Sequence, residues 1–456
     1  MSAQTDTQAS WRGPIGDSAF KKCRKHILPL LIIFYILAYI GRSNLGYASL
    51  TMNEELGITA AAYGLVAGIF FIGYFIFEVP SNIIMDKVGA RKWIARILIS
   101  WGIIVVIMGG LQNVTQLYIL RFLLGVAEAG FFPGVILYLS RWFLGRDSAK
   151  AISMFMLAIP ISYMIGAPLS GAISDNVFWL GLSSWRWIFI LEGIPSIIGG
   201  IVCLKILPDK PDSVSWLTDE EKTWLDASLK EEAARKPVQA KKYFSKEAFF
   251  NARMWLLLVV YFAVELGEYG LGFWTPLIIN DLSAGLSATT VGFLTALTYV
   301  FGAVALYWNG NHSDKVRERK WHCVVPLLLC AVAMSTIGNL TGSMWAVVML
   351  AIIIASVYAL FGPFWSLTDY YLTGPAAAVG IAMVNSFGNL AGFVSPTLIG
   401  VMKESTGQDF SGFYIIGICM VVAAVLIAVF VKNKELRAVE YAADEKANAE
   451  NYSQVK

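Results

Sequence analysis

Long apolar runs, separated by short polar or turn-forming clusters, extend over most of the chain. A helix that crosses a bilayer needs about 20 mostly apolar residues, and the runs have this length. The pattern predicts twelve membrane-spanning helices, near residues 26–50, 61–85, 92–111, 116–142, 149–175, 185–207, 253–280, 289–310, 321–340, 344–370, 376–402 and 411–432. The predicted fold class is therefore an all-α membrane protein.

One long polar segment, residues 208–252, divides six predicted spans from six others. Thr218 and Glu221 within it have the spacing of a capping box, which predicts a short amphipathic helix with Trp224 and Leu225 on its apolar side. We interpret the segment as a linker that lies on the cytoplasmic face. The predicted layout is a cytoplasmic N-terminal segment at 1–25, a six-helix half at 26–207, the linker at 208–252, a second six-helix half at 253–432 and a cytoplasmic tail at 433–456.

An internal repeat indicates how the two halves are related. Residues 82–93 align without gaps on residues 310–321, and the offset between Asp86 and Asp314, 314 − 86 = 228, is half of the 456 residues. Each copy follows the second span of its half, as expected for two pseudo-symmetric halves that face each other across a central cavity. Charged side chains in such turns can tie neighbouring helix ends together and release them, although a solvated run of charges is the alternative. The residues predicted to act in gating are Asp86, Arg91, Asp314 and Arg319.

Composition narrows the class of protein further. Hydrophobic residues make up 57% of the chain and charged residues 15%, whereas a soluble domain is about 25% charged. The mean hydropathy of +0.62 points the same way and excludes a soluble enzyme. A net charge of +3 is too small for a nucleic-acid-binding surface. The five cysteines have no metal-type spacing, and the sequence holds no nucleophile elbow or phosphate loop, so we expect no enzymatic activity, no cofactor and no metal.

The basic residues lie in alternate connections between the predicted spans. They cluster before the first span, in the turns at 87–92, 141–150 and 315–320, in the linker and in the tail. By the positive-inside rule, both termini are predicted to be cytoplasmic. The first apolar run is too long for a signal-peptide core and lacks a cleavage site, so we expect it to be retained. The predicted location is the inner membrane.

Three of the charged residues in the predicted spans of the first half are candidates for function, because an unpaired charge at membrane depth is costly. They are Arg42 in the first span and Arg121 and Glu128 in the fourth. The planar guanidinium of Arg42 can hold a substrate carboxylate through two hydrogen bonds, and the carboxyl of Glu128 can carry a coupling proton. The alternative is a permanent ion pair that fastens the first span to the fourth.

Aromatic and amide side chains complete a candidate substrate pocket. Tyr39 precedes Arg42 by one turn, and Tyr74 lies in the middle of the second span. Asn385 and Asn389 share one face of the eleventh span and can bind hydroxyl or carboxylate oxygens. The alternatives are hydrogen bonding between helices for the amides and ordinary interface positions for the aromatics. Trp365, which follows a Gly-Pro pair in the tenth span, is the remaining member of the predicted pocket.

Both copies of the repeat resemble the signature loop of the major facilitator superfamily. More narrowly, several motifs resemble the anion:cation symporter family, which includes the tartrate, hydroxyphenylacetate, phthalate and nicotinate permeases. The motifs are YIGRSNLG at 39–46, VPSN at 79–82, GVAEAGFFPG at 125–134, WRWIF at 185–189, YGLGFW at 269–274, GPFW at 362–365 and NSFGNLAG at 385–392. The resemblance implies proton-driven uptake of an organic carboxylate, in a cavity lined by Tyr39, Arg42, Tyr74 and Asn385.

One position departs from the family pattern. Gly41 stands where the family usually has an aspartate, a commonly invoked proton site. If transport needs a second protonatable group, Glu268 in the seventh span or Asp369 in the tenth can replace it. We favour Asp369 because it shares a helical face with Trp365, whereas Glu268 is expected to lie near the hydrated outer surface. The alternative for Asp369 is a position at the cytoplasmic mouth without a role in coupling.

These features together predict a monomeric secondary transporter that imports a small organic carboxylate, an aromatic or hydroxy acid, with protons by alternating access. The organic acid, protons and the lipid bilayer are its expected partners. Glu265, Glu268 and Asp369 leave open a carrier or uniporter for a cationic or zwitterionic solute. A membrane sensor that binds a ligand without moving it is the alternative of a different class.

Overall fold

The computed structural model describes residues 13–235, 252–282, 285–340, 343–372, 377–408 and 410–432. Regular structure within these ranges is helical. The α-helices are α1 (Gly13–Glu55), α2 (Ala60–Val88), α3 (Ala90–Met108), α4 (Val114–Glu128), α5 (Phe131–Leu139), α6 (Gly145–Met156), α7 (Ala158–Asn176), α8 (Ser184–Ile206), α9 (Asp219–Arg235), α11 (Ala252–Leu282), α12 (Ala288–Val316), α13 (Lys320–Thr336), α14 (Trp345–Tyr371), α15 (Ala377–Thr406) and α16 (Ser411–Phe430).

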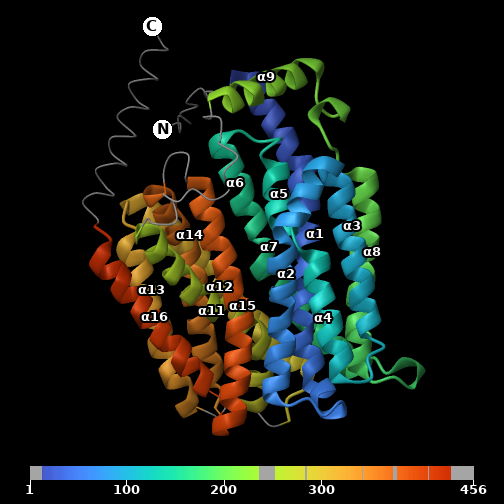
Figure 1. The fold of residues 1–456 in the computed structure, drawn as a ribbon, viewed down its shortest axis with the longest axis vertical. Helices are drawn as coiled ribbons and strands as arrows, with labels where there is room; N and C mark the ends of the chain where they lie inside the picture. The colour runs from blue at the N-terminus through green and yellow to red at the C-terminus, as the bar shows by residue number, and fades with distance from the viewer. Residues whose placement is uncertain are drawn as a thin grey trace, which may run out of the picture.

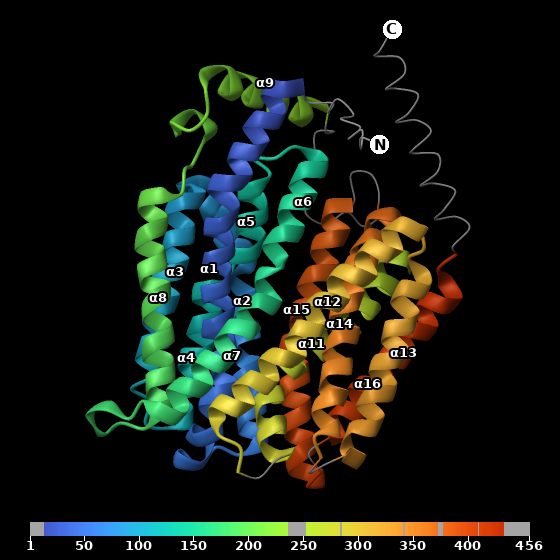
Figure 2. The same ribbon diagram turned by 180° about the vertical axis from the view of Figure 1, so that it is seen from behind.

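The helices form two bundles that stand side by side (Figures 1 and 2). The first bundle contains the spans α1, α2, α3, α4 with α5, α6 with α7, and α8, and the second contains α11 to α16. Ten segments of the described chain are long and apolar enough to cross a membrane, and α3 and α15 run alongside them. The predicted fold class, twelve spans in two pseudo-symmetric six-helix halves, is confirmed.

The fourth span is broken, whereas the sequence predicts one continuous helix. α4 ends at Glu128 and α5 begins at Phe131, because Gly130 adopts the left-handed conformation with φ of 83°. A Cβ on Gly130 would also lie 2.5 Å from the Oγ of Ser81, so this position requires glycine. The break leaves Glu128 at a helix end inside the bundle. The fifth predicted span is likewise divided, into α6 and α7.

The first helix begins thirteen residues before the predicted start of the first span. It extends past the bundle and contacts α9, which crosses this end of the molecule (Figure 1). We call the end of the molecule at which α9 lies the linker end, and the opposite end the far end. The extension is helical because Ala19, Phe20 and Cys23 lie on one face and are buried.

The linker helix α9 docks on this extension as its sequence predicts. The capping box forms: Thr218 donates its N–H to Glu221 Oε2 at 2.8 Å, and Glu221 donates its N–H to Thr218 Oγ1 at 3.2 Å. Leu225 is fully buried, and the ring of Trp224 meets Phe20 edge-on at 5.8 Å. The apolar side of α9 therefore packs against α1.

Glu221 also joins α9 to α1 through charge. Its carboxylate accepts hydrogen bonds from Lys22 Nζ at 2.8 Å and from Ser18 Oγ at 2.6 Å. Partial burial favours the neutral acid, but these bonds and the N–H of Thr218 outweigh it and lower the pKa of Glu221 to about 2. Because the folded pKa lies below the ordinary value of 4.5, this stabilisation is fully present above pH 4.5 and is lost as the pH falls toward 2.

We expect Glu221→Gln to loosen the docking of α9. A hydrogen bond to a charged group contributes about 1.5–3 kcal/mol, so amide hydrogen exchange in α9 should accelerate about tenfold or more at pH 7. The control is Glu220→Gln on the exposed side of the same helix. Equal exchange rates in the two variants would contradict a role for the ion pair.

The two bundles meet closely at the far end. A Cβ on Gly171 of α7 would lie 2.3 Å from the carbonyl oxygen of Ala288 in α12, and a Cβ on Gly292 would lie 2.4 Å from that of Ala167. The helices α2 and α15 approach in the same way, since a Cβ on Gly64 would lie 2.3 Å from the carbonyl oxygen of Pro396. Backbone packing of this kind closes the far end.

Reciprocal helix caps reinforce the far-end contact. Asp175 at the end of α7 accepts hydrogen bonds from the N–H groups of Ala288 at 3.0 Å and Thr289 at 2.7 Å, which begin α12. Glu404 at the end of α15 accepts the N–H of Ala61, which begins α2, at 2.8 Å. Each bundle thus supplies a carboxylate to a helix N-terminus of the other bundle, where the helix dipole favours negative charge.

We expect Gly292→Ala to open the far end. Steric overlap costs about 1–3 kcal/mol, enough to shift a two-state equilibrium about five- to 150-fold. Spin labels on the far ends of α7 and α12 should report a longer distance in this variant. The control is Gly310→Ala on the same helix, because a Cβ there meets nothing within 4 Å. An unchanged distance in Gly292→Ala would show that this packing does not hold the far end closed.

Candidate functional site

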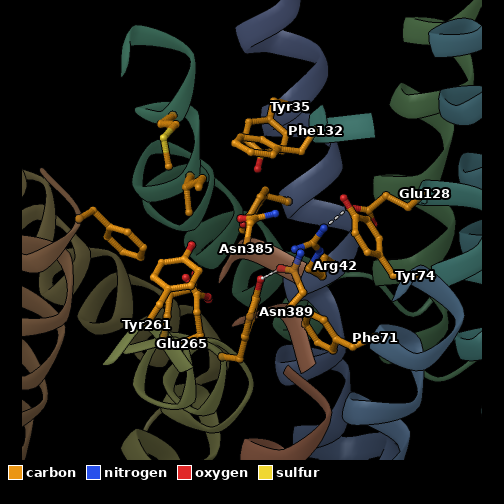
Figure 3. A pocket seen from close by; sticks show the side chains of 16 residues that line it. Tyr35, Arg42, Phe71, Tyr74, Glu128, Phe132, Tyr261, Glu265, Asn385 and Asn389 are labelled. Atoms are coloured by element: carbon orange, nitrogen blue, oxygen red, sulfur yellow. Dashed lines mark hydrogen bonds and ion pairs between the residues drawn. The ribbon is translucent and has the colours of Figure 1, made fainter. Parts of the chain in front are cut away.

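A cavity lies between the two bundles, and sixteen of the described side chains line it (Figure 3). The cavity volume is about 60 Å³. The lining residues are Tyr35, Tyr39, Arg42, Phe71, Tyr74, Glu128, Phe132, Met156, Ile159, Tyr261, Glu265, Glu268, Tyr269, Phe361, Asn385 and Asn389.

Arg42 and Glu128 form a buried ion pair at one side of this cavity (Figure 3). Arg42 is 7% exposed and Glu128 is 1% exposed. The guanidinium also lies 4.6 Å from the centroid of the Tyr39 ring. One carboxylate oxygen of Glu128 and the Nε of Arg42 have no hydrogen-bond partner among the described residues. The pair therefore lines the cavity with part of its hydrogen-bonding capacity unused, unlike a fully satisfied structural pair.

Arg121, the second arginine predicted at membrane depth, lies outside the cavity lining. It is fully buried and donates Nε to the carbonyl of Val66 at 3.3 Å and a terminal nitrogen to that of Ala67 at 3.4 Å. It also lies over the ring of Phe70, 5.1 Å from the centroid. These contacts join α4 to α2 and give Arg121 a structural position.

The predicted amides lie in the cavity with two of the predicted aromatics. Asn385 and Asn389 reach it from α15, and Asn389 accepts a hydrogen bond from the hydroxyl of Tyr269 at 2.9 Å (Figure 3). Tyr39 and Tyr74 lie on the opposite side, on α1 and α2. Amide, hydroxyl and guanidinium groups from both bundles therefore converge on one space.

Trp365 requires a correction. The sequence places it in the pocket, but in the structure it is not among the lining residues, and its ring meets that of Tyr261 edge-on at 5.0 Å. Tyr261 of α11 lines the cavity, and its ring stacks on Phe364 with the centroids 5.1 Å apart.

The acids of α11 also differ from expectation. Glu268 was predicted to stay near the hydrated surface, but it is 5% exposed and lines the cavity, as does Glu265 at 3%. One oxygen of Glu268 has no hydrogen-bond partner among the described residues. The backbone of Asp369 belongs to α14, and its side chain lies outside the described part of the chain.

The predicted gating residues lie at the linker end and do not form equivalent pairs. Asp86 pairs with Arg141 at 2.7 Å, and Arg91 pairs with Asp209 at 3.1 Å. In the second copy of the repeat, Asp314 pairs directly with Arg319. None of these three ion pairs joins one bundle to the other. Two connect helix ends of the same bundle, and the pair of Arg91 with Asp209 connects the first bundle to the linker.

Several cavity residues are absent from the sequence-based prediction. Tyr35 lies one turn before Tyr39 on α1, and Tyr261 and Tyr269 lie one turn on either side of Glu265. This helical spacing is a signal that could have identified them. Glu192 was missed as well; it is buried outside the cavity and accepts the hydroxyl of Ser170 at 2.6 Å.

Two six-helix bundles that enclose a charged cavity, closed at one end by backbone packing, define a secondary membrane transporter. The chain belongs to the Major Facilitator Superfamily, whose family description matches residues 31–396. It is a multi-pass membrane transporter and not an enzyme.

Known proteins of similar sequence are transporters. A protein of Agrobacterium vitis named "Putative tartrate transporter" is 42% identical over 413 residues, which cover 91% of each chain. The "Quinolone resistance transporter" of Acinetobacter baumannii is 40% identical over 400 residues, 88% of this chain and 92% of that protein. Among solved structures, the inward-open xylose transporter XylE from E. coli superposes with a TM-score of 0.71 at 15% identity, and covers 91% of this chain and 99% of its own.

Proposed function

We propose that the protein imports a small organic carboxylate together with protons, by alternating access across the inner membrane. The observation that carries this proposal is the Arg42–Glu128 pair, a buried cation and acid that face a cavity between two bundles. The similarity to a protein named for tartrate, a dicarboxylate, supports the substrate class.

The pair supplies a mechanism for coupling. While Glu128 is ionised, its carboxylate forms an ion pair with the Arg42 guanidinium and so competes with a substrate carboxylate for it. Protonation of Glu128 removes that competitor, and the guanidinium can then hold the carboxylate of a substrate through two hydrogen bonds. When Glu128 loses its proton, it competes for Arg42 again and favours release. Asn385 and Asn389 are proposed to bind further substrate oxygens, with Tyr39 and Tyr74 as the aromatic walls.

The proposed orientation of the protein in the membrane rests on the distribution of its basic residues. Lys and Arg cluster at the linker end, in the extension of α1 and in the turns after α2 and α12, so we place this end in the cytoplasm. The far end, closed by glycine packing, then faces the periplasm. Asp86, Arg91, Asp314 and Arg319 are proposed to hold helix ends together on the cytoplasmic side as the bundles rock.

Reconstitution tests this function directly. Proteoliposomes with an inward proton gradient should accumulate labelled tartrate, and a protonophore should abolish the accumulation. Competition by a carboxylate but not by an amine would agree with an anionic group on the substrate. Binding of tartrate without any flux, with the protein correctly inserted, would instead support the sensor alternative.

A second proton site is proposed because Gly41 cannot be protonated. Its candidates are Asp369 and Glu268, and the sequence argument favours Asp369. We expect Asp369→Asn to lower the number of protons moved per substrate by about one, as measured from charge movement and substrate flux in the same vesicles. An unchanged ratio in Asp369→Asn with a lower ratio in Glu268→Gln would move the role to α11. Unchanged ratios in both would leave Glu128 as the sole coupling acid.

A further inference from the structure

The charges around the cavity do not balance for a substrate that is only an anion. Among the described lining residues, Glu128, Glu265 and Glu268 are acids and Arg42 is a base. Glu128 contacts Arg42, whereas neither Glu265 nor Glu268 has an ion-pair partner in the described part of the chain. Double ionisation of two neighbouring buried carboxyls is unfavourable, so this pair carries at most one negative charge.

The Glu265 carboxyl lies across the cavity from Arg42. Figure 3 shows Glu265 beside Tyr261 on one side, Arg42 with Glu128 on the other, and the two asparagines between them. Glu265 is 3% exposed, so with a purely anionic substrate held by Arg42 an ionised Glu265 would lack a positive partner. An uncompensated buried charge is strongly unfavourable, whereas a cationic group on the substrate would neutralise it.

The aromatic lining favours the same group. Eight of the sixteen lining residues are aromatic. Among them, Tyr261, Tyr269 and Phe361 come from the bundle that carries Glu265 and Glu268. Ring faces attract cations, and sets of rings beside a carboxylate are typical of sites for quaternary ammonium groups. The same rings can also stack against an aromatic ring of the substrate.

We propose that the preferred substrate is an aromatic zwitterion, with its carboxylate on Arg42 and a cationic nitrogen beside Glu265 and Glu268. This assignment rests on the proposed function insofar as Arg42 is the carboxylate site. Opposite sides of the cavity then bind opposite ends of the substrate, and the amides of Asn385 and Asn389 lie between those two sides.

Three probes of nearly identical shape separate the possibilities. N-methylpyridinium-3-carboxylate is the zwitterion, 3-methylbenzoate is the matching anion, and N-methylpyridinium-3-carboxamide is the matching cation. Affinities are measured by calorimetry on the purified full chain at pH 7.5. The zwitterion should bind at least about tenfold more tightly than either of the others. In Glu265→Gln its advantage over 3-methylbenzoate should fall to about threefold or less, with the anion bound as well as or better than before.

Two further variants make the outcome decisive. Glu192→Gln changes a buried carboxyl outside the cavity and should keep the wild-type preference. Arg42→Ala should weaken the binding of the zwitterion and of the anion to a similar extent. Unchanged binding of both in Arg42→Ala would refute the proposed function, whatever the preference between them.

One result would overturn the zwitterion proposal and leave the proposed function intact. In it, Arg42→Ala weakens the binding of both carboxylates, but the wild-type protein binds 3-methylbenzoate as tightly as the zwitterion. The zwitterion proposal is also overturned if the zwitterion keeps its advantage in the Glu265→Gln/Glu268→Gln double variant, or if none of the three probes binds. Where a glutamine variant does not fold, the three wild-type affinities decide the question alone.

Discussion

Arg42→Ala is expected to weaken carboxylate binding by well over tenfold. Removal of one member of a desolvated, hydrogen-bonded charge pair typically costs about 2–5 kcal/mol. Arg42 is 7% exposed in the cavity wall, so water cannot replace the guanidinium well. Arg42→Lys should restore binding only in part, because an ammonium group lacks the planar fork that grips a carboxylate. Calorimetric titration of the purified variants with the transported carboxylate gives the measurement.

The matched control is Arg186→Ala. Arg186 is also a buried arginine paired with a glutamate, Glu55 at 3.2 Å, but it lies outside the cavity, where it donates to the carbonyl of Leu111. Its loss should lower thermal stability and leave the affinity of the folded protein unchanged. If Arg42→Ala binds the carboxylate as tightly as the Arg186 variant does, Arg42 is not the carboxylate site.

Glu128→Gln is expected to abolish accumulation driven by a pH gradient while exchange between loaded vesicles continues. Glutamine resembles the protonated acid in shape and charge, so it leaves Arg42 free to bind substrate but cannot release a proton. Counterflow of labelled against unlabelled substrate should therefore keep most of its rate. The two assays are run on the same proteoliposomes, with and without the proton gradient.

Glu192→Gln serves as the control for this prediction. It also neutralises a buried carboxyl of the first bundle, but one that is hydrogen bonded to Ser170 away from the cavity. Both assays should give near wild-type values. Full gradient-driven accumulation by Glu128→Gln would reject the assignment of the coupling proton, whereas loss of both exchange and accumulation would point to a structural role for the pair.

The spans and the linker helix could be predicted because their signals are local. A bilayer forces long apolar runs into helices, and the capping box needs only Thr218 and Glu221 at the right spacing. The break after Glu128 was not predicted, because the space that forces Gly130 to be glycine is set by Ser81 on another helix.

The cavity was predictable only in part for a similar reason. Arg42 and Glu128 stand out because charge is rare at membrane depth. Which aromatic faces the cavity depends on the rotation of each helix about its axis, and this is decided by packing. The exchange of Trp365 for Tyr261 in the lining is such a case. The two copies of the repeat also share six of twelve residues, including Asp86 and Asp314 themselves, yet their ion pairs differ.

The reciprocal caps at the far end bear on how fast such a carrier can turn over. When the bundles separate there, Asp175 and Glu404 and the helix N-termini that they cap become hydrated together. A charge at a helix end contributes about 0.3–1 kcal/mol when exposed, so both caps together add about 2 kcal/mol at most. A contribution of this size favours the conformation with the far end closed, but it is small enough for the bundles to separate there. The cost is comparable to moving one elementary charge through a membrane potential of 100 mV, which is about 2.3 kcal/mol. The energy stored in an ordinary membrane potential is therefore of the right size to reset this end of the molecule in each cycle.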